Sequence, residues 1–220
     1  MIICILGPPG SGKTTQVNRL LTGGFFENIV GLSVPKLCKS VADNSDQFLR
    51  KAEKEFVKAN LNAVEECKDK GKLFPIELDK LLIEVAIRQS SKGKTIMLEG
   101  FPRGIEQARL FSQAIFQSDF QCSVELICLK FYQQELNQCK MRQLSRALLM
   151  HSDIDETLKR INKINPKTEV YFENTLPGYR YLQSLGFEIH YVDATLDEDA
   201  VTTAIIQYCH SDKVKYEPIK

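Results

Sequence analysis

The sequence predicts an α/β protein built on a five-stranded parallel sheet with helices on both faces. Short, almost continuously apolar runs alternate with segments of helical period, which is the order expected when a helix crosses over from each strand to the next. The chain has 220 residues, of which 43% are hydrophobic, so one core can form without metal or disulfide staples. The strands are expected at residues 2–6, 29–32, 95–98, 124–129 and 189–192.

Helices are expected between these strands, because apolar residues recur there every three or four positions. Pro166 predicts a kink in the helix that follows Arg160, since proline lacks the N–H that a helix interior needs. After the second strand, the apolar spacing predicts an inserted amphipathic helix at about residues 44–66. The residues that define these faces are Val17, Leu20 and Leu21; Phe48, Ala52, Phe56 and Ala59; Leu78, Leu81, Leu82, Val85 and Ala86; and Ile154, Leu158, Ile161 and Ile164.

Charge and cysteine content narrow the class of protein. The 29 Lys and Arg residues against 28 Asp and Glu residues leave a formal net charge of +1, which gives no sign of a nucleic-acid or anionic-membrane partner. The 7 cysteines are an odd number without a Cys-x-x-Cys pair, so reduced thiols are expected rather than a zinc site or a disulfide framework. No apolar run approaches the ~18 residues of a membrane helix. We therefore expect a cytoplasmic protein.

A phosphate-binding pattern follows the first strand. Residues 7–14 read Gly-Pro-Pro-Gly-Ser-Gly-Lys-Thr and match G-x-x-x-x-G-K-[ST] in full, between an apolar strand and an amphipathic helix, as in the P-loop NTPase fold. The glycines let backbone N–H groups converge on phosphate oxygens, and Lys13 supplies a mobile cation for the β- and γ-phosphates. Thr14 or Thr15 can place a hydroxyl on Mg²⁺. The motif predicts a nucleotide-binding protein.

A second motif, Glu99-Gly-Phe-Pro-Arg103, follows the third strand. The carboxylate of Glu99 can orient the waters of Mg²⁺, and the guanidinium of Arg103 can hold an anionic substrate with two parallel hydrogen bonds. Gln107, four residues further on, carries the donor and the acceptor that a base edge requires. Taken alone, Glu99 and Arg103 fit a simple ion pair equally well.

Together the two motifs resemble the adenylate kinase and wider nucleoside-monophosphate kinase family, whose second motif begins with Asp. Further similar segments bring the resemblance to about residues 1–209; they lie at residues 71–78, 141–146, 153–160 and 191–195. The resemblance implies a Mg²⁺-assisted, in-line transfer of phosphoryl from ATP to a nucleoside monophosphate, with AMP as the favoured acceptor.

The resemblance also implies one domain over residues 1–220. Its core would comprise residues 1–33, 76–140 and 170–209, with a monophosphate-binding insertion at about 34–75 and a short lid at about 141–160.

The family's functional residues map onto this sequence by motif. The ATP-binding residues implied are Gly7, Gly10, Ser11, Gly12, Lys13, Thr14, Thr15, Arg142, Arg146, Thr195 and Leu196. The monophosphate-binding residues implied are Val34, Lys39, Lys72, Leu73, Phe74, Gly100, Phe101, Pro102, Arg103, Gln107 and Arg160. The catalytic cations implied are Lys13, Arg103, Arg142, Arg146 and Arg160, and the Mg²⁺ residues are Thr14 and Glu99, acting directly or through water.

Three departures from the family pattern bear on activity. Val34 replaces a hydroxyl residue that helps to recognise adenine, and Lys39 replaces a phosphate-binding arginine, keeping its charge without its planar fork. One lid arginine has no counterpart, and His151 lies near its position.

Four functions remain open from the sequence. The first is an AMP kinase, and the loss of a hydroxyl at Val34 keeps a CMP or UMP kinase open. Because the monophosphate loop and the lid are altered, a module that binds ATP with little or no turnover is a third possibility. The phosphate-binding motif alone is also compatible with a kinase of another small acceptor. A monomer without nucleic-acid or membrane partners is expected.

Overall fold

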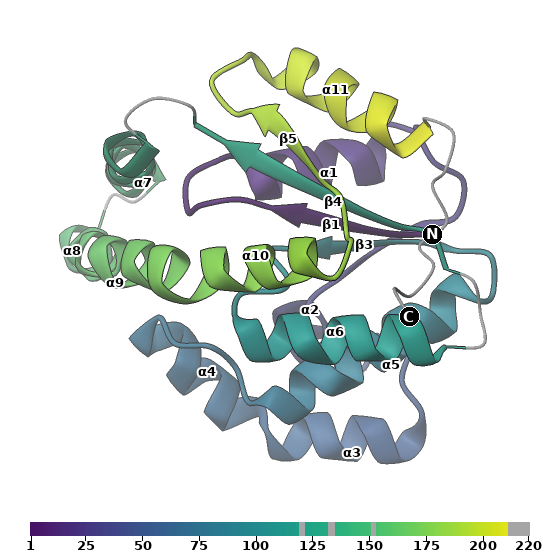
Figure 1. Cartoon of the computed structure of the whole chain (residues 1–220). Helices are drawn as coiled ribbons and strands as arrows, with labels where there is room; N and C mark the ends of the chain where they lie inside the picture. Colours follow the sequence, from purple (N-terminus) through teal and green to yellow (C-terminus); the bar gives the residue numbers. More distant parts are fainter. Residues whose placement is uncertain (119–121, 132–134, 151–152, 211–220) are drawn as a thin grey trace.

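The computed structural model describes residues 1–118, 122–131, 135–150 and 153–210. These residues form a five-stranded, all-parallel sheet of order β2-β3-β1-β4-β5 (Figure 1), which confirms the predicted fold class. Each strand begins where the sequence predicts and ends within one residue of the expected position. The strands are β1 (Ile2–Leu6), β2 (Ile29–Leu32), β3 (Thr95–Glu99), β4 (Val124–Lys130) and β5 (Ile189–Asp193).

Strand β1 lies at the centre of the sheet, paired with β3 on one edge and with β4 on the other. All five of its residues are buried, because helices cover both faces of the sheet. Alternate side chains therefore enter different cores: Ile3 and Ile5 join one cluster, and Ile2, Cys4 and Leu6 join the other.

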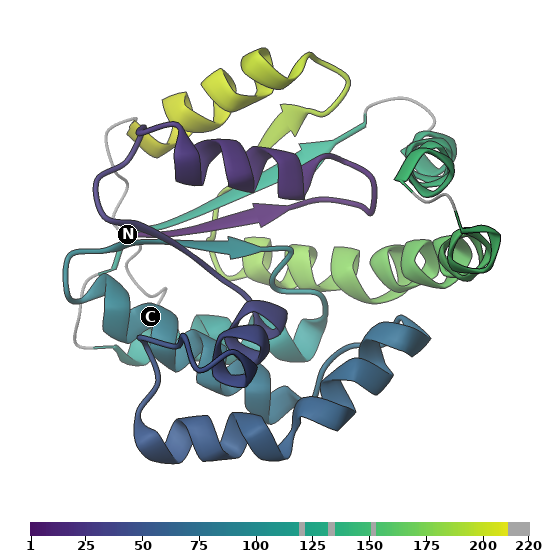
Figure 2. The ribbon, with the colours of Figure 1, turned by 180° about the vertical axis from the view of Figure 1, so that it is seen from behind.

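The helices form a layer on each side of the sheet (Figures 1 and 2). One face is covered by α1 (Lys13–Thr22) and α11 (Glu198–His210), which contribute Val17, Leu20 and Ile205 to the core. The opposite face is covered by α5 (Ile76–Ser90), α6 (Ile105–Gln117) and α10 (Leu176–Ser184). Within the described residues, no helix combines the length and apolarity needed to cross a membrane.

The segment between β2 and α5 contains α2 (Val34–Ala42), α3 (Lys51–Ala59) and α4 (Leu61–Lys70). The expectation of a single helix at about residues 44–66 is wrong. Asp46 accepts backbone N–H bonds from Phe48 and Leu49, which holds these residues in a turn ahead of α3. Asn60 then separates α3 from α4, and its side-chain amide donates to the carbonyl of Phe56.

Beyond the carboxyl ends of the strands lie α7 (Glu135–Met150), α8 (Ile154–Asn162) and α9 (Ile164–Val170), as Figure 1 shows. The kink predicted from Pro166 is found as a break in the helix just before the proline, because α8 ends at Asn162 and α9 begins at Ile164. Arg142 and Arg146 lie one turn apart on α7, as expected. A π-helical turn (Tyr171–Thr175) joins α9 to α10.

All seven cysteines lie within the described residues, and none of them is in a disulfide, as predicted. Burial raises the pKa of the Cys209 thiol to about 12 and that of Cys4 further still. These thiols therefore remain protonated and pack as small apolar groups.

A pair of leucine truncations tests the core assignment. Leu20→Ala removes a fully buried side chain from α1 and is expected to lower the free energy of unfolding by about 2–5 kcal/mol. Leu149→Ala makes the same change at an α7 position that is 85% exposed, and is expected to stay within about 0.5 kcal/mol of wild type. Urea unfolding of both variants measures the difference, and equal losses would contradict it.

Candidate functional site

Residues 7–12 form the turn between β1 and α1, at the carboxyl end of the sheet. Only glycine fits at Gly7, because its φ is +132° and a Cβ would lie 2.4 Å from the carbonyl oxygen of Leu129. Gly12 has a φ of +91° and is the N-cap residue of α1, so the first N–H groups of the helix face the turn. The Oγ atom of Ser11 is buried and, among the described residues, has no hydrogen-bond partner. The turn thus offers unpaired donors to an anion.

Lys13 bends back over this turn. Its Nζ atom donates to the carbonyl of Gly7 at 2.9 Å and to that of Pro8 at 2.7 Å. Burial lowers the pKa of Lys13 to about 8, the cation of Arg103 lowers it as well, and Glu99 opposes the shift. A phosphate bound in the turn would place a negative charge beside this ammonium group and stabilise its protonated form.

Thr14 and Glu99 meet at the edge of the turn, where the hydroxyl of Thr14 donates to Oε1 of Glu99 at 2.5 Å. Hydroxyl and carboxylate oxygens are ligands of the kind that Mg²⁺ prefers, so the pair fits a magnesium site. In the described part of the chain, no group of three or more His, Cys, Asp or Glu side chains gathers around a metal position. Such a cation would therefore take its other ligands from water and from nucleotide phosphates.

Two cavities open at this end of the sheet. The larger, the nucleotide cavity, has about 570 Å³ and is lined by residues 9–16, by Arg142 and Arg146 of α7, and by Arg160 of α8. The smaller, the acceptor cavity, has about 350 Å³ and is lined by Gly100, Arg103, residues 71–74 and the helical segment from Lys167 to Tyr179. Both cavities are lined by Pro9, Lys13 and Lys167.

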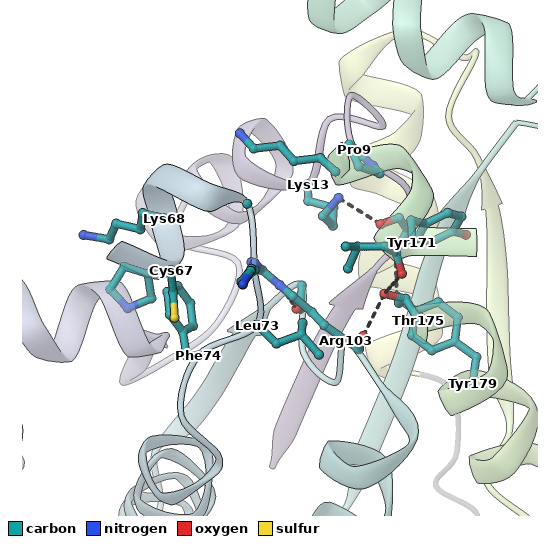
Figure 3. A pocket seen from close by; sticks show the side chains of 17 residues that line it. Pro9, Lys13, Cys67, Lys68, Leu73, Phe74, Arg103, Tyr171, Thr175 and Tyr179 are labelled. Carbon is teal, nitrogen blue, oxygen red and sulfur yellow. Dashed lines mark hydrogen bonds between the residues drawn. The ribbon is translucent and has the colours of Figure 1, made fainter. Parts of the chain in front are cut away.

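Arg103 is fixed in the acceptor cavity by its own turn. Its Nε donates to the carbonyl of Gly100 at 2.7 Å, and its carbonyl accepts from the hydroxyl of Thr175 at 2.9 Å. Gly100 has a φ of +61°, and a Cβ there would lie 3.2 Å from the guanidinium. Figure 3 shows Lys13 and Arg103 reaching into the space between the wall of Cys67 and Phe74 and the wall of Tyr171 and Thr175.

The amino-acid sequence is similar to those of known proteins. A family model described as an AAA domain matches residues 6–162. An adenylate kinase of Corynebacterium urealyticum is 27% identical over 213 residues, which cover 97% of this chain and 100% of the relative. An adenylate kinase of Mycobacterium marinum is 28% identical over 200 residues, covering 90% of this chain and 94% of the relative. One of Orientia tsutsugamushi (strain Boryong) is 33% identical over 120 residues, covering 54% and 49%.

The chain belongs to the AAA-domain family, as a divergent relative of the adenylate kinases. Membership sets the class of reaction, which is that of a nucleoside-monophosphate kinase.

In this adenylate kinase relative, most of the residues predicted for the site line one of three cavities. The nucleotide cavity is lined by Gly10, Ser11, Gly12, Lys13, Thr14, Thr15, Arg142, Arg146, Arg160 and Leu196. The acceptor cavity is lined by Gly7, Lys72, Leu73, Phe74, Gly100 and Arg103. A third cavity of about 20 Å³ is lined by Val34, Phe74, Glu99, Gly100, Phe101, Arg103 and Gln107.

Three of the predicted residues, Lys39, Pro102 and Thr195, line none of these cavities. Arg160, predicted to bind the monophosphate, lines the nucleotide cavity and not the acceptor cavity. Its Nε lies 3.4 Å from Oε1 of Glu156. His151 lies outside the described residues.

Sequence reasoning missed one side of the acceptor cavity. Tyr171, Thr175 and Tyr179 recur every four residues along the π-helical turn and α10, and all three line the cavity (Figure 3). The Tyr179 hydroxyl accepts from the backbone N–H of Gly7 at 3.2 Å, which ties this helix to the phosphate-binding turn. The spacing is visible in the sequence, but it equally fits an ordinary buried helix face.

Gln107 is held by protein groups at both ends of its amide. Its Oε1 accepts from the backbone N–H of Arg103 at 2.6 Å, and its Nε2 donates to Oδ2 of Asp79 at 2.7 Å. Asp79 is 2% exposed, and burial raises its pKa to about 7, although the Gln107 bond and the Arg103 cation oppose that rise. No motif or periodic pattern pointed to Asp79, which occurs within a largely apolar helix.

The raised pKa of Asp79 predicts a pH dependence of stability. The unfolded chain releases this proton near pH 3.8, whereas the folded protein keeps it until about pH 7. The stabilisation is therefore complete below pH 3.8 and is lost as the pH rises to about 7, by at most about 4 kcal/mol at about 1.4 kcal/mol per pKa unit.

The variant Asp79→Asn keeps an oxygen for Gln107 and cannot ionise, so its free energy of unfolding is expected to decline less over this range. Urea unfolding of both proteins at pH 5 and pH 8 measures the difference. Parallel profiles for the two proteins would contradict the assignment.

Proposed function

We propose that the protein transfers the γ-phosphoryl group of ATP to AMP, forming two ADP, with Mg²⁺ as cofactor. One observation carries the proposal: the cavity around the phosphate-binding turn and the cavity around Arg103 meet at Lys13. ATP in the first and a monophosphate in the second would bring their phosphates together there. The family supports this class of reaction.

The proposed reaction is an in-line displacement. An oxygen of the acceptor's phosphate dianion attacks the γ-phosphorus and forms a new P–O bond. The bond from that phosphorus to the oxygen it shares with the β-phosphate breaks, and its electron pair leaves with ADP. No proton has to move, so the protein's contribution is orientation and positive charge.

The charged side chains divide this work by position. Lys13, Arg142, Arg146 and Arg160 would hold the phosphates of ATP, and Arg103 would orient those of the acceptor. Thr14 and Glu99 would hold Mg²⁺, which supplies charge neutralisation at the β- and γ-phosphates when it is bound. We further propose that the insertion and the lid close over the substrates and exclude water, in a monomeric cytoplasmic protein.

AMP is the acceptor we propose because the full-length relatives are named adenylate kinases. Two observations favour other candidates. Val34 brings no hydroxyl to the cavity around Gln107, which keeps CMP and UMP as candidates. Lys39 lines none of the cavities, which favours a module that binds ATP without useful turnover.

The deciding experiment offers Mg-ATP together with AMP, CMP, UMP, GMP or dAMP in turn and measures the diphosphate formed. AMP is expected to give the highest kcat/KM. Faster turnover of CMP or UMP would change the acceptor. If ATP binds and no monophosphate yields a diphosphate, the binding module replaces the kinase.

Lys13→Ala tests the phosphate-binding turn. It is expected to lower kcat by at least about 100-fold with an unchanged melting temperature, because the charge on the phosphoryl group loses its nearest cation. Lys92→Ala removes an exposed lysine that lines none of the cavities and serves as the matched control. Normal turnover by Lys13→Ala would remove Lys13 from the reaction.

Arg103→Lys tests the acceptor cavity. Lysine keeps the charge and loses the planar fork, so KM for the monophosphate is expected to rise about 10-fold while KM for ATP changes less than about 3-fold. Arg109→Lys makes the same change at an exposed α6 position outside the cavities. Equal effects of Arg103→Lys on both substrates would contradict the role given to Arg103.

A further inference from the structure

The nucleotide cavity and the acceptor cavity share two cations, Lys13 and Lys167. They come from separate elements: Lys13 begins α1 at the phosphate-binding turn, and Lys167 lies in α9. A phosphoryl group that passes from one cavity to the other has to cross this junction. Lys13 already has a part in the proposed reaction, and Lys167 has none.

The ammonium group of Lys167 is not engaged by the protein. Within the residues that the structure describes, no hydrogen bond or ion pair holds it, although its side chain reaches both cavities. Neighbouring cations are engaged: Lys13 by the carbonyls of Gly7 and Pro8, Arg160 by Glu156, and Lys163 by Asp69 at 3.2 Å. Lys167 is therefore available to an anion that enters from either cavity.

The charges around Lys167 have one sign. Lys167 is exposed over part of its surface, and its pKa lies below the usual range, first because of the partial burial of its side chain and then because of the cations Lys163, Arg160, Arg103 and Arg146. The charged groups that shift this pKa include no carboxylate. Such a convergence of cations is unfavourable in an empty cavity and becomes favourable once a polyanion occupies it.

Local structure directs Lys167 to this place. The restart of the helix at Ile164 sets the direction of α9, and the pair between Lys163 and Asp69 ties its beginning to α4. Gly71 leaves room beside the Lys167 stem, since a Cβ built there would lie 3.8 Å from Cγ of Lys167.

We propose that Lys167 is a catalytic residue whose ammonium group binds the phosphates where ATP and the acceptor meet and stabilises the phosphoryl group in transfer. The inference rests on the proposed kinase function. Lys167 forms no covalent bond and keeps its proton. From α9, it supplies positive charge to the junction between the two cavities.

The test compares wild type with Lys167→Met, Lys167→Arg and Lys159→Met. Met removes the charge and keeps the length, and Arg restores the charge. Lys159→Met is the matched control, because Lys159 is exposed on α8 and lines neither cavity. Steady-state kinetics give kcat and both KM values. Calorimetry gives the affinities for ATP, for AMP and for a bisubstrate probe, two adenosines joined by a pentaphosphate chain.

For Lys167→Met, kcat is expected to fall at least about 30-fold and affinity for the probe at least about 10-fold, with the affinities for ATP and AMP alone changed less than about 3-fold. Lys167→Arg should recover kcat to within about 5-fold of wild type. The control variant Lys159→Met should have the kcat and the probe affinity of wild type. The melting temperatures of all variants should agree with that of wild type.

Two results overturn the inference: a Lys167→Met protein that keeps both kcat and probe affinity within about 3-fold of wild type, or a loss confined to the KM of one substrate. A wild-type protein that forms no diphosphate defeats the proposed function instead. In that case the probe still decides for Lys167, because its binding needs no turnover, and equal binding by wild type and Lys167→Met overturns the inference.

Discussion

The pairing of β1 with strands on both of its edges is the constraint on which the site depends. Because β3 is in parallel register with β1, the turns that follow Leu6 and Glu99 lie together at the carboxyl end of the sheet, beside the end of β4. The pairing continues beyond the strand, since the N–H of Gly100 donates to the carbonyl of Ile5 at 2.8 Å. The phosphate-binding turn and the Arg103 turn are thus held together by the sheet itself.

Electrostatics explain why the site is built for anions. The cations that line the two adjoining cavities include Lys13, Arg103, Arg146, Arg160 and Lys167. Desolvation lowers the pKa of Lys13 and of Lys167, and neighbouring cations lower both further. Folding places these charges together at a cost, which the packed sheet behind them offsets. An anion that binds there removes the repulsion, so the arrangement favours ligands with several negative charges over neutral ones.

The sequence predicted the features that depend on short stretches of chain. The central strands β3, β1 and β4 are largely buried on both faces and therefore read as short apolar runs, and the phosphate-binding turn needs glycines and a lysine at fixed spacing. Pro166 predicted the irregularity in its helix in the same way, because the effect of proline on the backbone is local. These features were found correctly for that reason.

Features that depend on distant partners were not predictable in this way. Asp79 matters because Gln107 lies against it, and Lys167 matters because two cavities meet beside it. In the inserted segment, the apolar spacing ran without interruption from Phe48 to Ala59, whereas the Asp46 side chain holds a turn ahead of α3 and α3 ends at Ala59. Spacing reports which face is apolar, and it does not report which competing hydrogen bond wins.

The acceptor cavity and the small cavity that shares Phe74, Gly100 and Arg103 with it differ in chemistry. At the phosphate end, Arg103 and Lys13 present positive charge, whereas the small cavity beyond them is lined by Val34, Asp79 and Gln107. The departure from the family at Val34 thus lies in a cavity that Arg103 also lines, beside a carboxyl and an amide that already bind each other. Under the proposed function, a base that approaches there has to pair with that couple or displace it, whereas transfer of the phosphoryl group depends on the cations.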